Sequence, residues 1–142
     1  MTSYLGIEVR MLPISQKFTT DDGISLAADV WGSDEHPAVL LAHGGGQTRH
    51  AWKEVGETLG RAGYYAVAFD ARGHGDSDWA PDGAYGQDLM VEDLICVIAA
   101  LGGRRAVLVG ASMGGGTCLV AVGEDRVDAT ALLLVDIAPQ IE

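Results

Sequence analysis

Residues 106–116, AVLVGASMGGG, decide the fold of this chain. The first four residues are apolar and are typical of a buried strand, and the mostly apolar residues 113–122 predict a helix directly afterwards. Between the two lies a Gly-x-Ser-x-Gly motif, with Gly110 and Gly114 on either side of Ser112. A sharp strand-to-helix turn tolerates no bulk at the two glycine positions, and it lifts the central side chain clear of the sheet. The pattern therefore predicts a nucleophile elbow that presents the Ser112 hydroxyl.

Short apolar runs and helical segments alternate on both sides of this turn. Strands are predicted at residues 38–42, 65–69, 106–109 and 131–135. Helices are predicted at residues 87–101 and 113–122 and through Trp52, Val55 and Leu59, and a hairpin is predicted around Asp21-Asp22-Gly23. Fully apolar strands that alternate with helices are typical of a parallel sheet covered on both faces. The predicted fold class is α/β, with three layers and a mostly parallel sheet flanked by helices.

A second glycine-rich loop, HGGGQ at residues 43–47, directly follows one of the predicted strands. Loops that follow the carboxyl ends of parallel strands meet at one edge of the sheet, so this loop is expected beside Ser112. The N–H of Met113 opens the predicted helix, and an N–H of Gly45 or Gly46 can be turned toward the same point. These three residues are the candidate donors of an oxyanion hole.

Two histidines occupy these loops and invite other interpretations. His43 could be a base or a metal ligand, but a buried histidine that holds its loop is the favoured interpretation. His74 lies in the polar segment DARGHGDSD at residues 70–78, where we expect it to brace the loop by hydrogen bonding rather than to act as a base. Asp76 and Asp78 resemble metal ligands only superficially, and they are interpreted as solvated turn formers. No metal site is predicted.

Composition excludes several classes of function. The 142 residues include 9 Lys and Arg against 20 Asp and Glu, a net charge of −11, which argues against nucleic acids and anionic membrane surfaces as partners. No apolar stretch approaches the ~20 residues of a membrane helix, and Glu8 and Arg10 interrupt any signal-peptide core. Cys96 and Cys118 are too few for a disulfide framework. A cytoplasmic protein is the resulting expectation.

Three segments together resemble the alpha/beta-hydrolase superfamily: HGGGQTRHAW at residues 43–52, DARGHGDSDW at residues 70–79 and VGASMGGG at residues 109–116. They occur in the order typical of that family, each after a predicted strand. The resemblance covers essentially the whole chain, and it implies a serine hydrolase in which Ser112 attacks an ester, thioester or lactone without a cofactor. It also implies a small-molecule acyl substrate. Related epoxide hydrolases and haloalkane dehalogenases carry Asp at the nucleophile position, whereas cofactor-free perhydrolases resemble this elbow closely.

The chain departs from the family pattern after the elbow. A catalytic triad in this fold has the order serine, then acid, then histidine. All four histidines, His36, His43, His50 and His74, precede Ser112, so the chain contains no candidate for the triad histidine. Asp136, at the end of the last predicted strand, is a candidate triad acid, or a residue that braces the loop before Pro139.

Two hypotheses follow from this departure. In the first, residues 1–142 are the N-terminal part of a single alpha/beta-hydrolase domain, incomplete at its C-terminal side, whose cap and later strands are absent from the chain. In the second, the chain is a non-catalytic α/β module or a pseudoenzyme. In either case the strand at residues 131–135 is expected to be the last of the sheet, with one edge unpaired. We therefore expect self-association or pairing with a complementary C-terminal fragment.

Overall fold

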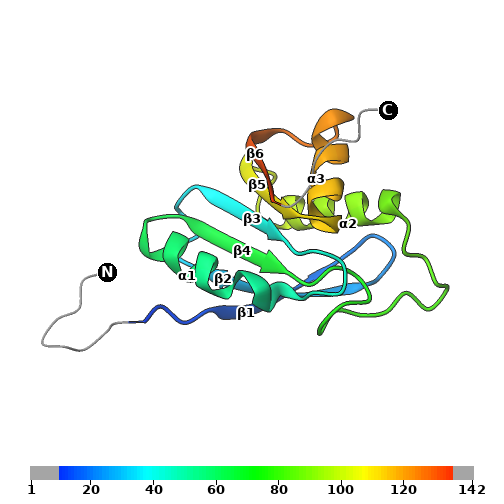
Figure 1. Ribbon diagram of the computed structural model, residues 1–142, viewed down its shortest axis with the longest axis horizontal. Coiled ribbons are helices and arrows are strands. Elements are labelled where there is room, and N and C mark those ends of the chain that lie inside the picture. Colours follow the sequence, from blue (N-terminus) through cyan, green and yellow to red (C-terminus); the bar gives the residue numbers. More distant parts are fainter. Residues whose placement is uncertain (1–9, 136–142) are drawn as a thin grey trace, which may run out of the picture.

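The computed structural model describes residues 10–135, which form six strands, three α-helices and one short 3-10 helix (Figure 1). The strands are β1 Ile14–Thr19, β2 Ser25–Trp31, β3 Ala38–Ala42, β4 Tyr65–Phe69, β5 Ala106–Ala111 and β6 Ala129–Val135. The helices are α1 Lys53–Arg61, α2 Gln87–Ala100 and α3 Met113–Gly123, and the 3-10 helix η1 Arg49–Trp52 leads into α1. The strands predicted at residues 38–42 and 65–69 match β3 and β4 at both ends, and the other predicted strands differ by one or two residues.

The six strands form one twisted sheet in the order β1-β2-β4-β3-β5-β6 (Figure 1). Strands β4, β3, β5 and β6 run parallel to their neighbours in this half of the sheet. The hairpin of β1 and β2 is antiparallel and joins the sheet through an antiparallel pairing with β4. The mostly parallel α/β sheet predicted from the apolar runs is therefore confirmed, because strands buried on both faces need helices on both sides.

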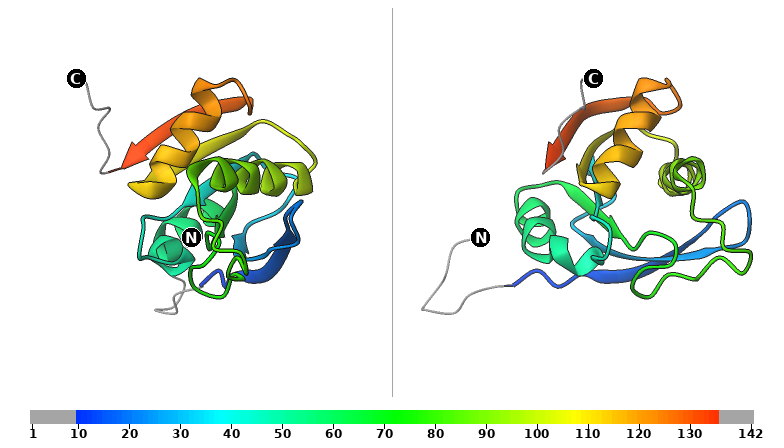
Figure 2. Two further views of the ribbon diagram at one scale, coloured as in Figure 1. Left: turned by 90° about the vertical axis from the view of Figure 1, so that its right-hand side faces the viewer. Right: turned by 45° about the vertical axis from the view of Figure 1, so that its right-hand side comes forward.

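The helices divide between the two faces of the sheet (Figure 2). Helix α1 covers one face, over a core that includes Trp31, Leu41 and Trp52. Helices α2 and α3 cover the other face, over a larger core that includes Leu40 and Leu94. Alternate residues of β3 thus enter opposite cores, as the two-residue period of a strand requires.

The carboxyl ends of the three central strands lie side by side. Ala42 at the end of β3 is in register with Phe69 at the end of β4 and with Gly110 in β5. The three segments that follow these strands, residues 43–47, residues 70–78 and the turn into α3, are therefore brought together at one edge of the sheet. This is where ligands bind in open α/β sheets.

Strand β6 ends the sheet among the described residues, as the sequence predicts, and pairs there only with β5. The side chains of Leu133 and Val135 are 50% and 41% exposed. One edge and part of one face of this strand are therefore uncovered within residues 10–135. Among residues 10–135, no helix has the length and the apolar character of a membrane-spanning segment.

Candidate active site

Ser112 lies on a strained turn between β5 and α3. Its backbone has φ 48° and ψ −110°, a conformation that a residue with a side chain adopts only when its surroundings enforce it. The turn is fastened on both sides, because the Ser112 N–H donates to the Val135 carbonyl at 3.1 Å and the Gly116 N–H donates to the Ser112 carbonyl at 2.9 Å. The serine is exposed, and within residues 10–135 its hydroxyl has no hydrogen-bond partner. The fold thus holds a free hydroxyl at the edge where the loops meet.

The glycines around Ser112 are required by close backbone contacts. A Cβ on Gly110 would lie 2.5 Å from the Cα of Gly115. A Cβ on Gly114 would lie 2.4 Å from the carbonyl oxygen of Ala42, and the Gly114 N–H donates to the His43 carbonyl at 3.1 Å. The start of α3 is therefore packed against the end of β3, as the spacing of the Gly-x-Ser-x-Gly motif indicates.

The loop at residues 44–46 lies against the elbow. A Cβ built on Gly45 would be 3.8 Å from the Cβ and Sδ of Met113. The Gly46 N–H donates to Nε2 of His74 at 3.3 Å. The N–H groups of Gly45 and Met113 have no partner within the described part of the chain. Of the two glycine donors that the sequence leaves open, Gly45 is the one whose N–H is free.

His43 is buried, and both of its ring nitrogens are engaged. Its Nδ1 donates to the Gly44 carbonyl at 2.8 Å, and its Nε2 accepts from the Ala71 N–H at 2.9 Å. Burial lowers the pKa of this imidazole, so the neutral ring is the stable form. His43 therefore ties the β3 loop to the β4 loop, which is the structural role expected from the sequence.

His74 also braces a loop. Its Nδ1 lies 3.0 Å from the Arg72 carbonyl, and its ring stands 5.1 Å from that of His43 at a 52° tilt. Since Nε2 accepts from Gly46, neither nitrogen is free to take a proton from Ser112. The loop-bracing expectation for this residue is confirmed.

The other two histidines, His36 and His50, lie outside the two loops that contain His43 and His74. His36 is exposed in the turn before β3, and His50 lies in η1, where its Nδ1 is 3.9 Å from a carboxylate oxygen of Asp29. Within residues 10–135, no histidine is hydrogen bonded to Ser112. Asp136, the candidate triad acid, lies outside the described residues.

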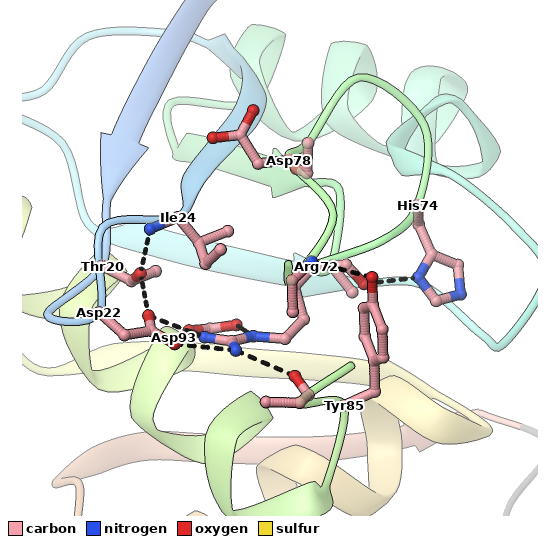
Figure 3. Close-up of polar contacts among 12 residues, drawn as sticks. Thr20, Asp22, Ile24, Arg72, His74, Asp78, Tyr85 and Asp93 are labelled. Carbon is pink, nitrogen blue, oxygen red and sulfur yellow. Dashed lines mark hydrogen bonds and ion pairs between the residues drawn. The ribbon is translucent and has the colours of Figure 1, made fainter. Parts of the chain in front are cut away.

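Sequence reasoning missed a buried ion cluster below the loop at residues 70–78 (Figure 3). The Arg72 side chain is only 1% exposed, and it forms two 2.7 Å bonds with the Asp93 carboxylate from α2. Two bonds of 3.0 Å join Arg72 to Asp22 in the β1–β2 turn, and a third partner is the Ala84 carbonyl at 3.1 Å. The cluster joins three segments that are distant in sequence. It fixes the backbone from which His74 projects.

Burial raises the pKa of Asp93, while hydrogen bonds from Arg72 lower the pKa of Asp22. The pKa of the Arg72 guanidinium is raised by its bonds to Asp93. A signal for this cluster was present in the sequence. Asp93 lies next to Leu94 and four residues before Val97, on the face of the helix that enters the core. A carboxylate on such a face needs a cationic partner.

A second missed cluster surrounds Asp70, which is fully buried at the end of β4. Its carboxylate accepts from the Arg49 side chain at 2.5 Å, from the Arg49 N–H at 2.6 Å and from the Asp76 N–H at 2.8 Å. Asp76 also pairs with Arg49 at 3.0 Å, and Asp78 accepts from the Ser25 N–H at 2.9 Å. Asp76 and Asp78 are both exposed, as expected for solvated turn formers, and their hydrogen bonds also fasten the loop.

A narrow cavity lies under the elbow, lined in part by Met90, Asp93, Met113 and Thr117. Its volume of about 20 Å³ is enough for about one water molecule.

Comparison with known proteins agrees with this geometry. A family model described as the alpha/beta hydrolase fold matches residues 37–141. An esterase of Mycobacterium tuberculosis is 39% identical over 117 residues, which are 81% of this chain and 37% of the esterase. A bifunctional esterase/perhydrolase of Acinetobacter calcoaceticus is 35% identical over 98 residues, which are 69% of this chain and 35% of that protein.

Among solved structures, a thioesterase domain from the curacin biosynthetic pathway matches with a TM-score of 0.83 at 30% identity. The match covers 92% of this chain and 48% of the thioesterase chain. The chain thus spans less than half the length of these relatives. The family match covers most of its residues, and the sheet order and the elbow agree with it. The chain belongs to the alpha/beta-hydrolase family.

Proposed function

We propose that this chain carries the nucleophile and the oxyanion hole of a serine acyl hydrolase. Ser112 Oγ attacks the carbonyl carbon of an ester or related acyl bond, and the new C–O bond pushes the carbonyl electrons onto oxygen. The oxyanion is stabilised by the N–H groups of Met113 and Gly45. The proton of Ser112 passes to a base and then to the leaving group, whose bond to carbon breaks as the intermediate collapses to an acyl-enzyme. Water then hydrolyses the acyl-enzyme and Ser112 regains its proton.

The observation that supports this proposal most is the backbone of Ser112. A φ of 48° at a serine costs about 1–3 kcal/mol, and the structure retains it where glycine would be relaxed. The strained turn exposes a hydroxyl beside two N–H groups that have no partner within residues 10–135, and one of them opens a helix, the position favoured for anions. The substrate class is a small molecule with an ester, thioester or lactone bond. The names of the esterase and thioesterase relatives favour this class.

We propose further that the 142-residue chain turns over such substrates poorly. Proton transfer from Ser112 needs a base, and the nitrogens of His43 and His74 are already bonded to the loops. The base and the acid that orients it would come from a complementary C-terminal segment, with Asp136 as a candidate for the acid. The alternative in which the chain is a non-catalytic module predicts no chemistry at Ser112 at all.

Incubation with p-nitrophenyl acetate separates these possibilities. We expect slow acetylation of Ser112, seen by mass spectrometry of the intact chain and its peptides, without sustained release of nitrophenol. Ser112→Ala should abolish the acetylation, whereas Ser15→Ala, at an exposed serine of β1, should leave it unchanged. Rapid multiple turnover that is lost in Ser112→Ala would show that one of the chain's own groups is a base. No acetylation of the unmodified chain would contradict a nucleophilic Ser112.

A perhydrolase is a second candidate function, favoured by the bifunctional esterase/perhydrolase relative. In this case hydrogen peroxide replaces water as the acceptor of the acyl group. Its oxygen attacks the acyl carbon, the bond to Ser112 Oγ breaks, and a peracid leaves as the serine regains its proton. The same acyl-enzyme serves both outcomes, so the ratio of peracid to acid formed in the presence of peroxide distinguishes them.

Strand β6 leads to a proposal about association. We propose that the isolated chain associates through this strand, because its free edge and the exposed Leu133 and Val135 can pair with a second strand. The net charge of −11 opposes association at low salt, but this repulsion is screened over about 10 Å at 0.1 M. Association should therefore increase with salt.

Light scattering at low and physiological salt measures this association. Leu133→Lys is expected to reduce the apparent mass at physiological salt, since it places a charge on the exposed side of β6. Val55→Lys adds the same charge at a similarly exposed apolar residue of α1 and should have little effect. A monomer in both salts, or equal effects of the two variants, would contradict association through β6.

A further inference from the structure

We infer that His74 is a positioning residue of the oxyanion hole: its imidazole holds the loop at residues 44–46 so that the Gly45 N–H faces the elbow. The inference rests on the proposed role of Ser112 as a nucleophile. It assigns the second oxyanion donor to Gly45 rather than Gly46. It also accounts for a histidine that, within residues 10–135, is not hydrogen bonded to the serine and belongs to no group of side chains that could hold a metal.

The glycine loop at residues 44–46 is held by hydrogen bonds. Gly46 has φ +76°, and nothing lies within 4 Å of the place where its Cβ would be. Side-chain packing therefore does not fix this peptide. Its N–H donates to Nε2 of His74 at 3.3 Å, and the Gln47 N–H donates to the Gly44 carbonyl at 3.1 Å. Glycine peptides have access to a wide range of backbone angles, so the bond to His74 selects one of them.

The partners of the His74 imidazole determine which nitrogen carries the proton. Nδ1 of His74 lies 3.0 Å from the Arg72 carbonyl, which can only accept, so Nδ1 carries the hydrogen. Nε2 of a neutral imidazole with this tautomer has a lone pair, and it can accept from Gly46. The ring is also held at its side, because the His43 ring stands 5.1 Å away.

The backbone that holds the His74 imidazole is itself anchored by a buried ion cluster. The Arg72 carbonyl belongs to the residue whose side chain is bound between Asp93 and Asp22, below the loop on which Figure 3 places His74. This anchor is buried and joins α2 to the β1–β2 turn. The fixed Arg72 carbonyl therefore determines the orientation of the His74 imidazole, and the imidazole determines the conformation of the glycine loop. An N–H group that already points at the developing negative charge stabilises an oxyanion well, because the loop does not have to rearrange during the reaction.

Two variants distinguish the effect of the hydrogen-bond acceptor at Nε2 from the effect of the packed ring. His74→Phe keeps a planar ring against His43 but has no acceptor, whereas His74→Gln offers Oε1 as an acceptor in place of Nε2. The first measurement is amide hydrogen exchange of Gly46 by NMR in the 142-residue chain. Exchange should become at least about fivefold faster in His74→Phe and should change less than twofold in His74→Gln.

The second measurement is the affinity for phenylboronic acid. Its boron accepts the Ser112 oxygen, the serine proton passes to water, and the anionic tetrahedral adduct places an oxygen in the oxyanion hole. We expect about tenfold weaker binding for His74→Phe and less than threefold for His74→Gln. Binding is an equilibrium, so it needs no general base. Ser112→Ala should form no adduct.

The outcomes keep the two proposals distinct. If the unmodified chain forms no boronate adduct, the proposed nucleophile fails, while amide exchange still decides whether His74 holds Gly46. If the adduct forms but His74→Phe changes neither exchange nor affinity, the role of His74 is overturned. It is also overturned if His74→Gln loses as much amide protection and boronate affinity as His74→Phe, because the hydrogen-bond acceptor would then be irrelevant. Thermal unfolding of both variants identifies any general loss of structure.

Discussion

Gly114→Ala is expected to destabilise the chain by about 3 kcal/mol or more, a loss at the upper end of single substitutions. The added Cβ would lie 2.4 Å from the Ala42 carbonyl oxygen and 2.6 Å from that of His43. Both obstacles are backbone atoms at the end of a central strand, and the Gly114 N–H is itself bonded to the His43 carbonyl. Neither side can yield without separating α3 from β3. Denaturant unfolding followed by circular dichroism measures the loss.

Gly123→Ala is the matched control, on the same helix. No atom lies within 4 Å of its Cβ position, and alanine is the better helix former by up to about 1 kcal/mol. This variant should be as stable as the unmodified chain or slightly more stable. If Gly114→Ala unfolds at the same denaturant concentration as Gly123→Ala, the close packing of the elbow against β3 is refuted.

The central strands could be predicted from the sequence because their signal is local. Residues 38–42 and 65–69 are apolar throughout, which suits only a strand buried on both faces, and β3 and β4 occupy the same ranges. The elbow could be predicted because its Gly-x-Ser-x-Gly motif occupies five consecutive residues. The contact that requires Gly114 is not local, because it is made with Ala42 at the end of β3.

The loop at residues 70–78 could not be predicted in this way. Arg72 finds Asp22 fifty residues earlier and Asp93 twenty-one residues later, and nothing in its own neighbourhood specifies either partner. The choice between Gly45 and Gly46 is set in the same manner, by a contact with His74 from another strand end. Two adjacent glycines cannot be told apart in a sequence motif, and only their contacts in the tertiary structure distinguish them. The location of the candidate site and its candidate donors, Met113 with Gly45 or Gly46, could thus be predicted, whereas the choice between the two glycines could not.

Arg72→Met is the second substitution with a large expected effect. It preserves much of the side-chain volume but leaves the Asp93 carboxylate, which is 3% exposed, without its cation. Removing one partner of a buried ion pair costs about 3–5 kcal/mol, because the remaining charge stays buried. Asp22 adds little to the loss, since its side chain is 44% exposed and water can solvate it. Urea unfolding at neutral pH measures the change in free energy.

The loss should depend on pH in a defined direction. Burial already raises the pKa of Asp93, and removal of the guanidinium raises it further. A carboxyl whose folded pKa exceeds its unfolded value stabilises the fold while protonated, and this stability is lost as pH rises through the folded pKa. The destabilisation by Arg72→Met should therefore be complete at neutral pH and should shrink as the pH falls toward about 4, the unfolded pKa of Asp.

Two comparisons make the test specific to the buried charge. Arg105→Met breaks the exposed pair with Asp128, whose side chains are 61% and 78% exposed, and should cost less than about 1 kcal/mol at every pH. Adding Asp93→Leu to Arg72→Met removes the stranded carboxylate and should recover much of the lost stability, since an apolar side chain suits a site between α2 and the sheet. If the double variant is no more stable than Arg72→Met, the penalty comes from lost packing rather than from an uncompensated charge. The ion cluster would then not be what anchors the loop that carries His74.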